Sequence, residues 1–264
     1  MTLFGLVRTR GAAPEVPVLN VAVDVGTGPV VVLLHGIASS SSSWRSLVPL
    51  LTPLYRVIAI DVLGFGGSRA PAGSTFTLDE HVRALRKTIR SLHLRGSYTL
   101  VGHSLGALIS SRCAAVHRRE IAQLILVAPP LYPELRYLDE FAHRLRVGGY
   151  LWFYRLVRGN RLAITRTAGR FSRWMPNGAL KLDDESWVAF SKSMEHCIET
   201  QTTTTDLAQV SAPVDIVYGS RDQVIVPGPL ERLGTMHHVQ VHEVLHADHL
   251  MREPIAREIA RLIR

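Results

Sequence analysis

Short apolar runs recur along the chain, and amphipathic stretches separate them. The runs have the length of β-strands, while the stretches between them repeat their apolar residues every three or four positions, as helices do. The predicted strands are residues 16–25 (as a β segment or a hairpin), 30–34, 56–60, 98–101, 123–128, 214–218 and 239–244. This alternation predicts an α/β fold with a mostly parallel central sheet covered by helices on both faces.

Three helix starts stand out between these strands. Thr77 and Glu80 have the spacing of a capping box, in which the Thr accepts from the backbone and the Glu reaches back, and this predicts a helix to about residue 92. A second helix is expected directly after Ser104. Pro254, in a first-turn position, opens a last helix to about residue 263.

The alternation breaks once, over residues 129–207, where the pattern is helical and no convincing strand appears. Prolines punctuate both ends of this stretch, at residues 129–130 and at 213. We therefore expect a core formed by residues 1–128 and 208–264, with 129–207 inserted into it as a helical subdomain.

Composition and charge narrow the class of protein. No segment has the length and apolarity of a spanning helix and the amino-terminal stretch has no signal-peptide core, so a cytoplasmic location is expected. The two cysteines, Cys113 and Cys197, are predicted to be small buried side chains, and no metal-ligand spacing is visible.

Residues 136–181 hold ten basic and two acidic residues, an excess equal to the +8 of the whole chain. A basic region so confined disfavours general binding to nucleic acid.

The stretch Gly102-His103-Ser104-Leu105-Gly106 follows an apolar strand and has the form G-x-S-x-G. In a nucleophile elbow the serine lies on a strained turn between strand and helix, where side chains two residues before and after it would collide. The pattern predicts Ser104 as a nucleophile. His103 is expected to pack at the elbow and not to act as a second base.

A serine nucleophile needs two donors for the oxyanion that forms on its substrate. His35-Gly36-Ile37 directly follows the strand that ends at residue 34, and such a turn can point the Ile37 amide toward the elbow. The second donor is expected to be the amide of Leu105, the residue after the nucleophile.

The serine also needs a base and an acid that orients it. Asp222 lies just past the strand at 214–218, at the carboxyl edge where open α/β sheets place their sites. Asp61, after an earlier strand, is expected instead to hold the glycine-rich turn at residues 64–67. The base must follow the final strand, which leaves His246 and His249; we favour His249, since it lies in a loop directly before the last helix.

Taken together, these motifs resemble the α/β-hydrolase superfamily, in its cap-bearing branch with a serine nucleophile, and they match its landmarks in order from about residue 16 onward. The resemblance implies Ser104 as nucleophile, Asp222 as acid, His249 as base, and the amides of Ile37 and Leu105 as oxyanion hole. It also implies that residues 129–207 are the cap. The chain has Asp248 where the family usually has glycine before the base.

The resemblance implies a cofactor-free hydrolase. Related epoxide hydrolases and haloalkane dehalogenases carry an aspartate in place of Ser104, which disfavours those activities. Hydrolysis of a carboxylic ester through an acyl-enzyme is expected first. Cleavage of a carbon–carbon bond in a ring-fission product and haloperoxidase-like perhydrolysis are the alternatives, and a ligand-binding protein with this fold is the non-enzymatic one.

The expected cap carries an aromatic cluster at residues 150–154 followed by many arginines. His35, Gly36, His103 and Trp152 are predicted to line the substrate pocket. The small-molecule substrate is expected to be an ester or acyl compound, lipophilic or anionic. In one interpretation, the arginines of the cap face water. In a sharper one, the cap makes a peripheral contact with an anionic membrane surface. The oligomeric state is left open.

Overall fold

A computed structural model describes residues 15–131, 184–200, 202–225 and 227–264. The described strands form one seven-stranded sheet in the order β1-β3-β2-β4-β5-β6-β7. They are β1 (Val21–Val25), β2 (Val30–Leu34), β3 (Arg56–Ile60), β4 (Tyr98–His103), β5 (Ile121–Val127), β6 (Val214–Gly219) and β7 (Val239–Val244). Only β1 runs antiparallel to its neighbour, which confirms the predicted fold class.

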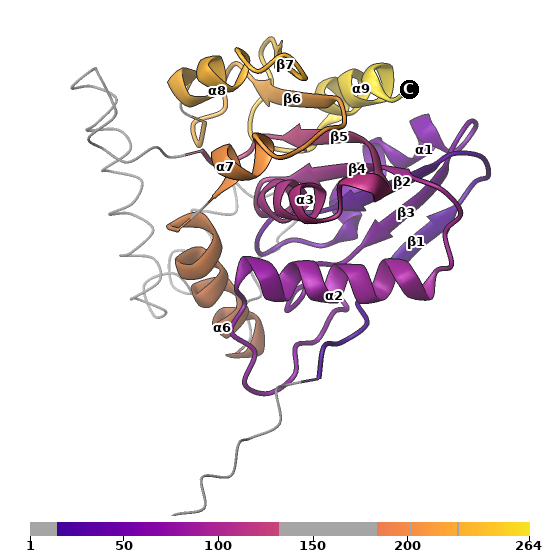
Figure 1. The fold of residues 1–264 in the computed structure, drawn as a ribbon, viewed down its shortest axis with the longest axis vertical. Helices are drawn as coiled ribbons and strands as arrows, with labels where there is room; N and C mark the ends of the chain where they lie inside the picture. Colours follow the sequence, from indigo (N-terminus) through magenta and orange to yellow (C-terminus); the bar gives the residue numbers. More distant parts are fainter. Residues whose placement is uncertain (1–14, 132–183, 201, 226) are drawn as a thin grey trace, which may run out of the picture.

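Helices cover both faces of this sheet (Figure 1). The described helical elements are η1 (Ser41–Ser46), α1 (Val48–Leu51), α2 (Leu78–Ser91), α3 (Leu105–Val116), η2 (Arg118–Glu120), α6 (Asp184–Ser193), η4 (Met194–Ile198, a π-helix), α7 (Thr203–Leu207), α8 (Pro227–Leu233) and α9 (Glu253–Leu262). On one face α2, α3 and α7 pack together, whereas α1 and α9 contact each other on the opposite face. The helix α6 lies beside the amino end of α2 (Figure 1).

The central strands consist of continuous apolar runs because both of their faces are covered. Every residue of β4 is buried, and so is all of β2 except its first residue. The helix α3 is buried almost all round, and its small residues let it approach the sheet closely. By contrast, α2 buries one stripe and exposes the basic residues Arg83, Lys87 and Arg90.

The register of the strands brings the functional loops together. Leu34 pairs with Ile60 on one side and with Gly102 on the other, so β2, β3 and β4 end in the same row. Gly219 at the end of β6 pairs with Val244 at the end of β7. Since all of these strands are parallel, the loops that carry the predicted chemistry leave the sheet at one edge.

Two local predictions are met in part. Of the two forms predicted for residues 16–25, a β segment or a hairpin, the structure has the β segment, shortened to Val21–Val25, which pairs with β3 so that Val25 lies opposite Val57. The capping box at the start of α2 is half present. Glu80 N donates to Thr77 Oγ1 over 3.3 Å, but the Glu80 carboxylate reaches further back and accepts from the amides of Thr75 and Phe76.

The predicted insertion is only partly within the described residues. After residue 183 it is helical, through α6, η4 and α7, before the chain returns to the sheet at β6. Trp152 and the whole basic segment 136–181 fall in the stretch 132–183, outside the described residues.

Candidate active site

Ser104 lies at the turn between β4 and α3, with φ 52° and ψ −115°. A non-glycine residue rarely adopts this conformation, and such strain is concentrated at functional sites. Hydrogen bonding holds the turn, since Ser104 N donates to Val127 O over 2.9 Å. The structure therefore has the sharp strand-to-helix turn that the sequence predicts.

Glycine is required on both sides of this turn. A Cβ atom on Gly102 would lie 2.3 Å from the carbonyl oxygen of Gly106, and one on Gly106 would lie 2.3 Å from Leu34 O. Real Cβ atoms do not approach backbone oxygens so closely, and no flexible side chain could move aside. The two glycines allow α3 to start directly against the end of β2.

Asp222 and His249 form a hydrogen-bonded pair. The Nδ1 atom of His249 lies 2.8 Å from Asp222 Oδ2; because a carboxylate accepts, Nδ1 carries the proton and Nε2 is left as an acceptor. The Asp222 side chain is fully buried, while that of His249 is 23% exposed. Asp222 Oδ1 also accepts from Val224 N over 2.9 Å, which fixes the carboxylate plane.

His246, the other candidate base, points elsewhere. It is exposed, has φ 62°, and its Nδ1 atom lies 3.2 Å from Arg221 Nη2. Its backbone N–H donates to Ser220 Oγ. Of the two candidates it is His249 that faces Asp222, as the sequence interpretation favours.

A close contact between strand ends brings the loop of His249 next to Asp222. A Cβ on Gly219 would lie 2.3 Å from Ala247 O, so the loop after β7 packs directly on the end of β6. Arg221 N donates to the same oxygen of Ala247 over 2.9 Å. Asp248, the departure from the family pattern, accepts from Leu250 N and pairs with Arg252.

His103 connects the elbow to this base loop. Its Nε2 atom lies 2.8 Å from the carbonyl oxygen of His249, so Nε2 carries the proton and donates. Burial, reinforced by the neighbouring His249, lowers the pKa of His103 to about 3. The ring is therefore neutral near pH 7, which fits a packing and donor role and not a second base.

The two amides predicted to form an oxyanion hole lie at the elbow. Leu105 is the first residue of α3, where backbone N–H groups have no partner within the helix and favour negative charge. A Cβ on Gly36 would lie 3.1 Å from the Cβ of Ser104, so the loop that contains Ile37 packs against the serine. Among the described residues, neither the Ile37 nor the Leu105 amide has a hydrogen-bond acceptor.

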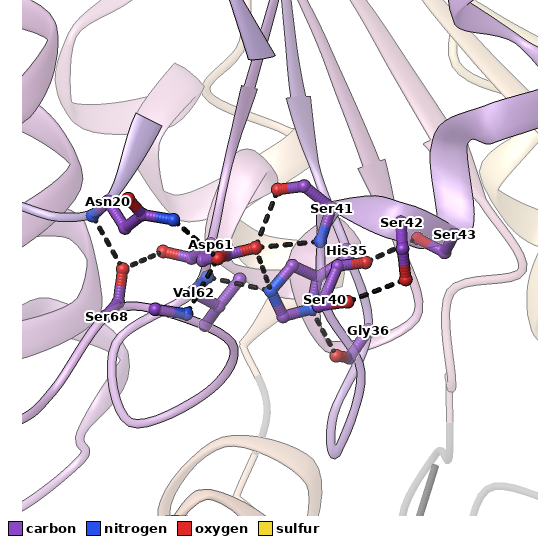
Figure 2. Close-up of polar contacts among 11 residues, drawn as sticks. Asn20, His35, Gly36, Ser40, Ser41, Ser42, Ser43, Asp61, Val62 and Ser68 are labelled. Carbon is purple, nitrogen blue, oxygen red and sulfur yellow. Dashed lines mark hydrogen bonds and ion pairs between the residues drawn. The ribbon is translucent and has the colours of Figure 1, made fainter. Parts of the chain in front are cut away.

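His35 is wholly buried beneath this loop, and Figure 2 shows its contacts. Its Nδ1 donates to Gly36 O over 2.7 Å, and its Nε2 accepts from Val62 N over 2.9 Å. Burial lowers the pKa of His35, which keeps the ring neutral. With both ring nitrogens bound to backbone, His35 supports the loop that contains Ile37 and has no free ring nitrogen.

Asp61 holds the glycine-rich turn, as the sequence predicts. Its Oδ2 atom accepts from Gly67 N over 2.8 Å, and a Cβ on Gly66 would fall 2.4 Å from its carboxyl carbon. Asp61 also contacts two residues that sequence reasoning missed: it accepts from Asn20 Nδ2 and, twice, from Ser41 (Figure 2). It thus joins three loops beside the site.

The end of the predicted insertion packs on the core next to these loops. A Cβ on Gly64 would lie 2.4 Å from the Cβ of Ala189 in α6, so the turn after β3 contacts this helix without a gap. Side chains of α6 and η4 donate to three successive carbonyls: Lys192 Nζ to Ser74 O (2.7 Å), His196 Nδ1 to Thr75 O (2.6 Å) and Cys197 Sγ to Phe76 O (3.3 Å). No sequence motif indicates this attachment.

In the described part of the chain, no group of three or more His, Cys, Asp or Glu side chains is arranged to hold a metal ion. None of the helices in the same residues has the length and apolarity to cross a membrane.

The model of the family described as "alpha/beta hydrolase fold" matches residues 29–252. The chain belongs to this family. A crystal structure of a serine hydrolase involved in carbazole degradation superposes with a TM-score of 0.67 and 22% identity, covering 90% of both chains, which shows the shared fold.

Two curated proteins are similar over shorter stretches. "Probable lysophospholipase BODYGUARD 3" of Arabidopsis thaliana is 41% identical over 107 residues, which are 39% of this chain and 22% of that protein. The "2-hydroxy-6-oxo-6-(2'-aminophenyl)hexa-2,4-dienoic acid hydrolase" of Metapseudomonas resinovorans is 34% identical over 107 residues, 39% of this chain and 37% of that protein. Each alignment spans well under half the length of the relative.

Proposed function

We propose that this chain is a serine hydrolase that cleaves a carboxylic ester of a lipophilic substrate through an acyl-enzyme. The observation that carries the proposal is the 2.8 Å hydrogen bond between His249 and buried Asp222, in a loop held against the strained elbow of Ser104. An orienting acid, a base with a free Nε2 and a nucleophile on a strained turn are the parts that acyl transfer needs.

In the first half of the reaction, Ser104 Oγ attacks the ester carbonyl carbon while His249 Nε2 takes the hydroxyl proton. The amides of Ile37 and Leu105 donate to the oxyanion of the tetrahedral intermediate. Asp222 stabilises the imidazolium that forms. The intermediate collapses as the C–O bond breaks, and the alcohol leaves with the proton from His249.

In the second half, water attacks the acyl-enzyme and His249 takes one of its protons. The same two amides hold the second oxyanion. The bond from the acyl carbon to Ser104 breaks, the proton returns to the serine oxygen, and the carboxylic acid departs. The cycle consumes one water and needs no cofactor.

A fluorophosphonate probe and a series of p-nitrophenyl esters test this proposal. We expect the wild type to be labelled and to hydrolyse long-chain esters with a higher kcat/KM than the acetate. Ser104→Ala should lose both properties. Ser110→Ala, which removes a buried hydroxyl from the helix after the elbow, is the matched control and should keep them.

The outcomes separate the alternatives. If the wild type is not labelled, the ligand-binding interpretation replaces the enzymatic one. A preference for the acetate would contradict the lipophilic substrate, which the similarity to a protein named as a lysophospholipase supports.

Carbon–carbon bond hydrolysis of a ring-fission product is the second candidate. The similarity to a protein named as a hydrolase of a 2-hydroxy-6-oxo-dienoic acid favours it. A ring-fission diketone belongs in the same screen. Turnover of the diketone with no turnover of any ester would replace the first proposal with this one.

We also propose that residues 129–207 form a cap over the site and that its basic segment can meet an anionic membrane surface. The helices α6 and α7 and the contact between α6 and the turn at Gly64 support the first part. Sedimentation with vesicles of phosphatidylserine and phosphatidylcholine tests the second. No sedimentation at low salt would refute the membrane contact, because such binding is strongest there.

A further inference from the structure

The elbow residue before the nucleophile is bound to the loop that carries the base. His103 Nε2–H donates to the carbonyl oxygen of His249 over 2.8 Å, between residues 146 positions apart in the chain. The two imidazole rings are adjacent, with centroids 5.0 Å apart. The residue directly before Ser104 therefore also contacts the backbone of the proposed base.

This hydrogen bond has no substitute nearby. Among the described residues, the carbonyl of His249 has no other donor and its N–H has no acceptor. The side chain of His249 is attached separately, through Asp222. The base is thus held at two points, with its ring bound to the loop after β6 and its backbone bound to the end of β4.

The surroundings of His103 make its contact rigid. The residue is only 8% exposed, so water has little access to the bond. A Cβ on Gly36 would lie 3.1 Å from His103 Nδ1, which means that the oxyanion loop packs on the other edge of the ring. His249, Asp222 and His35 are the titratable groups that act on this ring, and its own pKa of about 3 leaves it neutral across an ordinary assay range.

We propose that His103 is a positioning residue, whose Nε2–H holds the backbone of His249 so that the base stays in line between Ser104 and Asp222. The inference rests on the proposed function of the triad. It adds a fourth side chain to the machinery, one that acts through the backbone of His249. Displacements of about 1 Å in such a constellation cost up to about 100-fold in rate.

Three variants test the role. His103→Phe keeps the ring volume and removes the donor, whereas His103→Gln keeps an amide N–H near the place of Nε2. His238→Phe is the matched control, since His238 Nε2 also donates to a backbone carbonyl, that of Leu207, over 3.1 Å at the amino end of β7. The urea midpoint of unfolding is measured for all three variants, to show that each of them is folded.

We expect His103→Phe to lower kcat about 10-fold to 100-fold with little change in KM. His103→Gln should recover most of the loss, and His238→Phe should keep the wild-type kcat. The proposal is overturned if His103→Phe keeps its kcat, if His103→Gln is as slow as His103→Phe, or if His238→Phe loses as much.

A measurement without substrate separates this inference from the proposed function. The proton between His249 Nδ1 and Asp222 gives a low-field resonance in the proton NMR spectrum when it is protected from exchange. We expect that resonance to broaden in His103→Phe, to return in His103→Gln and to be unchanged in His238→Phe. An unchanged resonance in His103→Phe would refute the positioning role, even if the wild type hydrolysed no ester and the proposed function failed.

Discussion

Ser41 donates both its backbone N–H and its hydroxyl to one carboxylate oxygen of Asp61, each over 2.7 Å. The contact joins the loop after β2, which carries Ile37, to the turn after β3. The other oxygen of Asp61 binds Gly67 N and Asn20 Nδ2. All four donors converge on a buried carboxylate, which makes Asp61 a structural centre beside the proposed oxyanion hole.

Asp61→Asn is expected to destabilise the protein by about 3 kcal/mol at pH 7, because an amide NH₂ would face donors where the carboxylate now accepts. Urea denaturation measures this loss. Asp24→Asn is a suitable control, since Asp24 pairs with Arg56 on the surface and should contribute much less. An equal loss in both variants would contradict the central role of Asp61.

The effect should depend on pH. Burial raises the pKa of Asp61, but the hydrogen bonds from Gly67, Ser41 and Asn20 outweigh it and hold the pKa below the usual 3.8. A depressed pKa in the folded state means that this stabilisation is complete above pH 4 and is lost as the pH falls through the folded-state value. The gap in unfolding free energy between wild type and Asp61→Asn should therefore narrow below pH 4.

Two glycines with positive φ test the packing around Asp61. Gly66 has φ 57°, and a Cβ there would strike the Asp61 carboxylate, whereas Gly73 has φ 85° and a Cβ there would meet nothing within 4 Å. Gly73→Ala should cost only the backbone strain, about 1 kcal/mol. Gly66→Ala should cost about 3 kcal/mol, because overpacking adds to that strain. Thermal or urea unfolding of both variants measures the difference, and equal losses would show that the turn can relax.

The choice between the two candidate bases can be tested directly. His249→Ala should lose about 10⁴-fold or more in kcat, since it removes the proposed acceptor of the Ser104 proton. His246→Ala should keep nearly full activity, because His246 is exposed and contacts Arg221 and Ser220. The assay is hydrolysis of the best p-nitrophenyl ester. A large loss in His246→Ala would reassign the base.

Much of the fold can be predicted from the sequence because its central strands are continuous apolar runs. The bounds of β2, β3 and β7 coincide with the predicted ones. Near residue 16 the pattern is weaker and the prediction allows a hairpin. The pairing of β1 with β3 depends on the twist and edge of the whole sheet, which a local pattern does not contain.

The residues of the candidate site also fall into two groups, those that a local motif predicts and those that only the folded chain brings together. Ser104 and its flanking glycines follow a local rule, so the sequence alone indicates them. Nothing in the local sequence distinguishes Ser41 from the four serines around it. It is the register of β2 and β3 that brings Ser41 to Asp61. The donor role of His103 depends likewise on where a loop 146 residues later lies. Long-range geometry decides such contacts.

The two cysteines should report how the end of the insertion detaches from the core. Both are free and buried, and burial raises the pKa of each to about 12, so neither should react with iodoacetamide in the native state. Cys113 lies in α3, which packs against both β4 and α2. Cys197 lies in η4, where it is covered by contacts with the loop at Phe76.

Local opening of α6 and η4 breaks fewer buried contacts than unfolding of the core. We therefore expect Cys197 to be alkylated before Cys113 at urea concentrations below the main transition, as measured by mass spectrometry of the labelled peptides. Gly64→Ala should accelerate the labelling of Cys197 specifically, because the new Cβ would press on Ala189 and on the Phe76 ring. Gly73→Ala is the control for backbone strain. Simultaneous labelling of both cysteines in every variant would mean that α6 and η4 unfold only with the core.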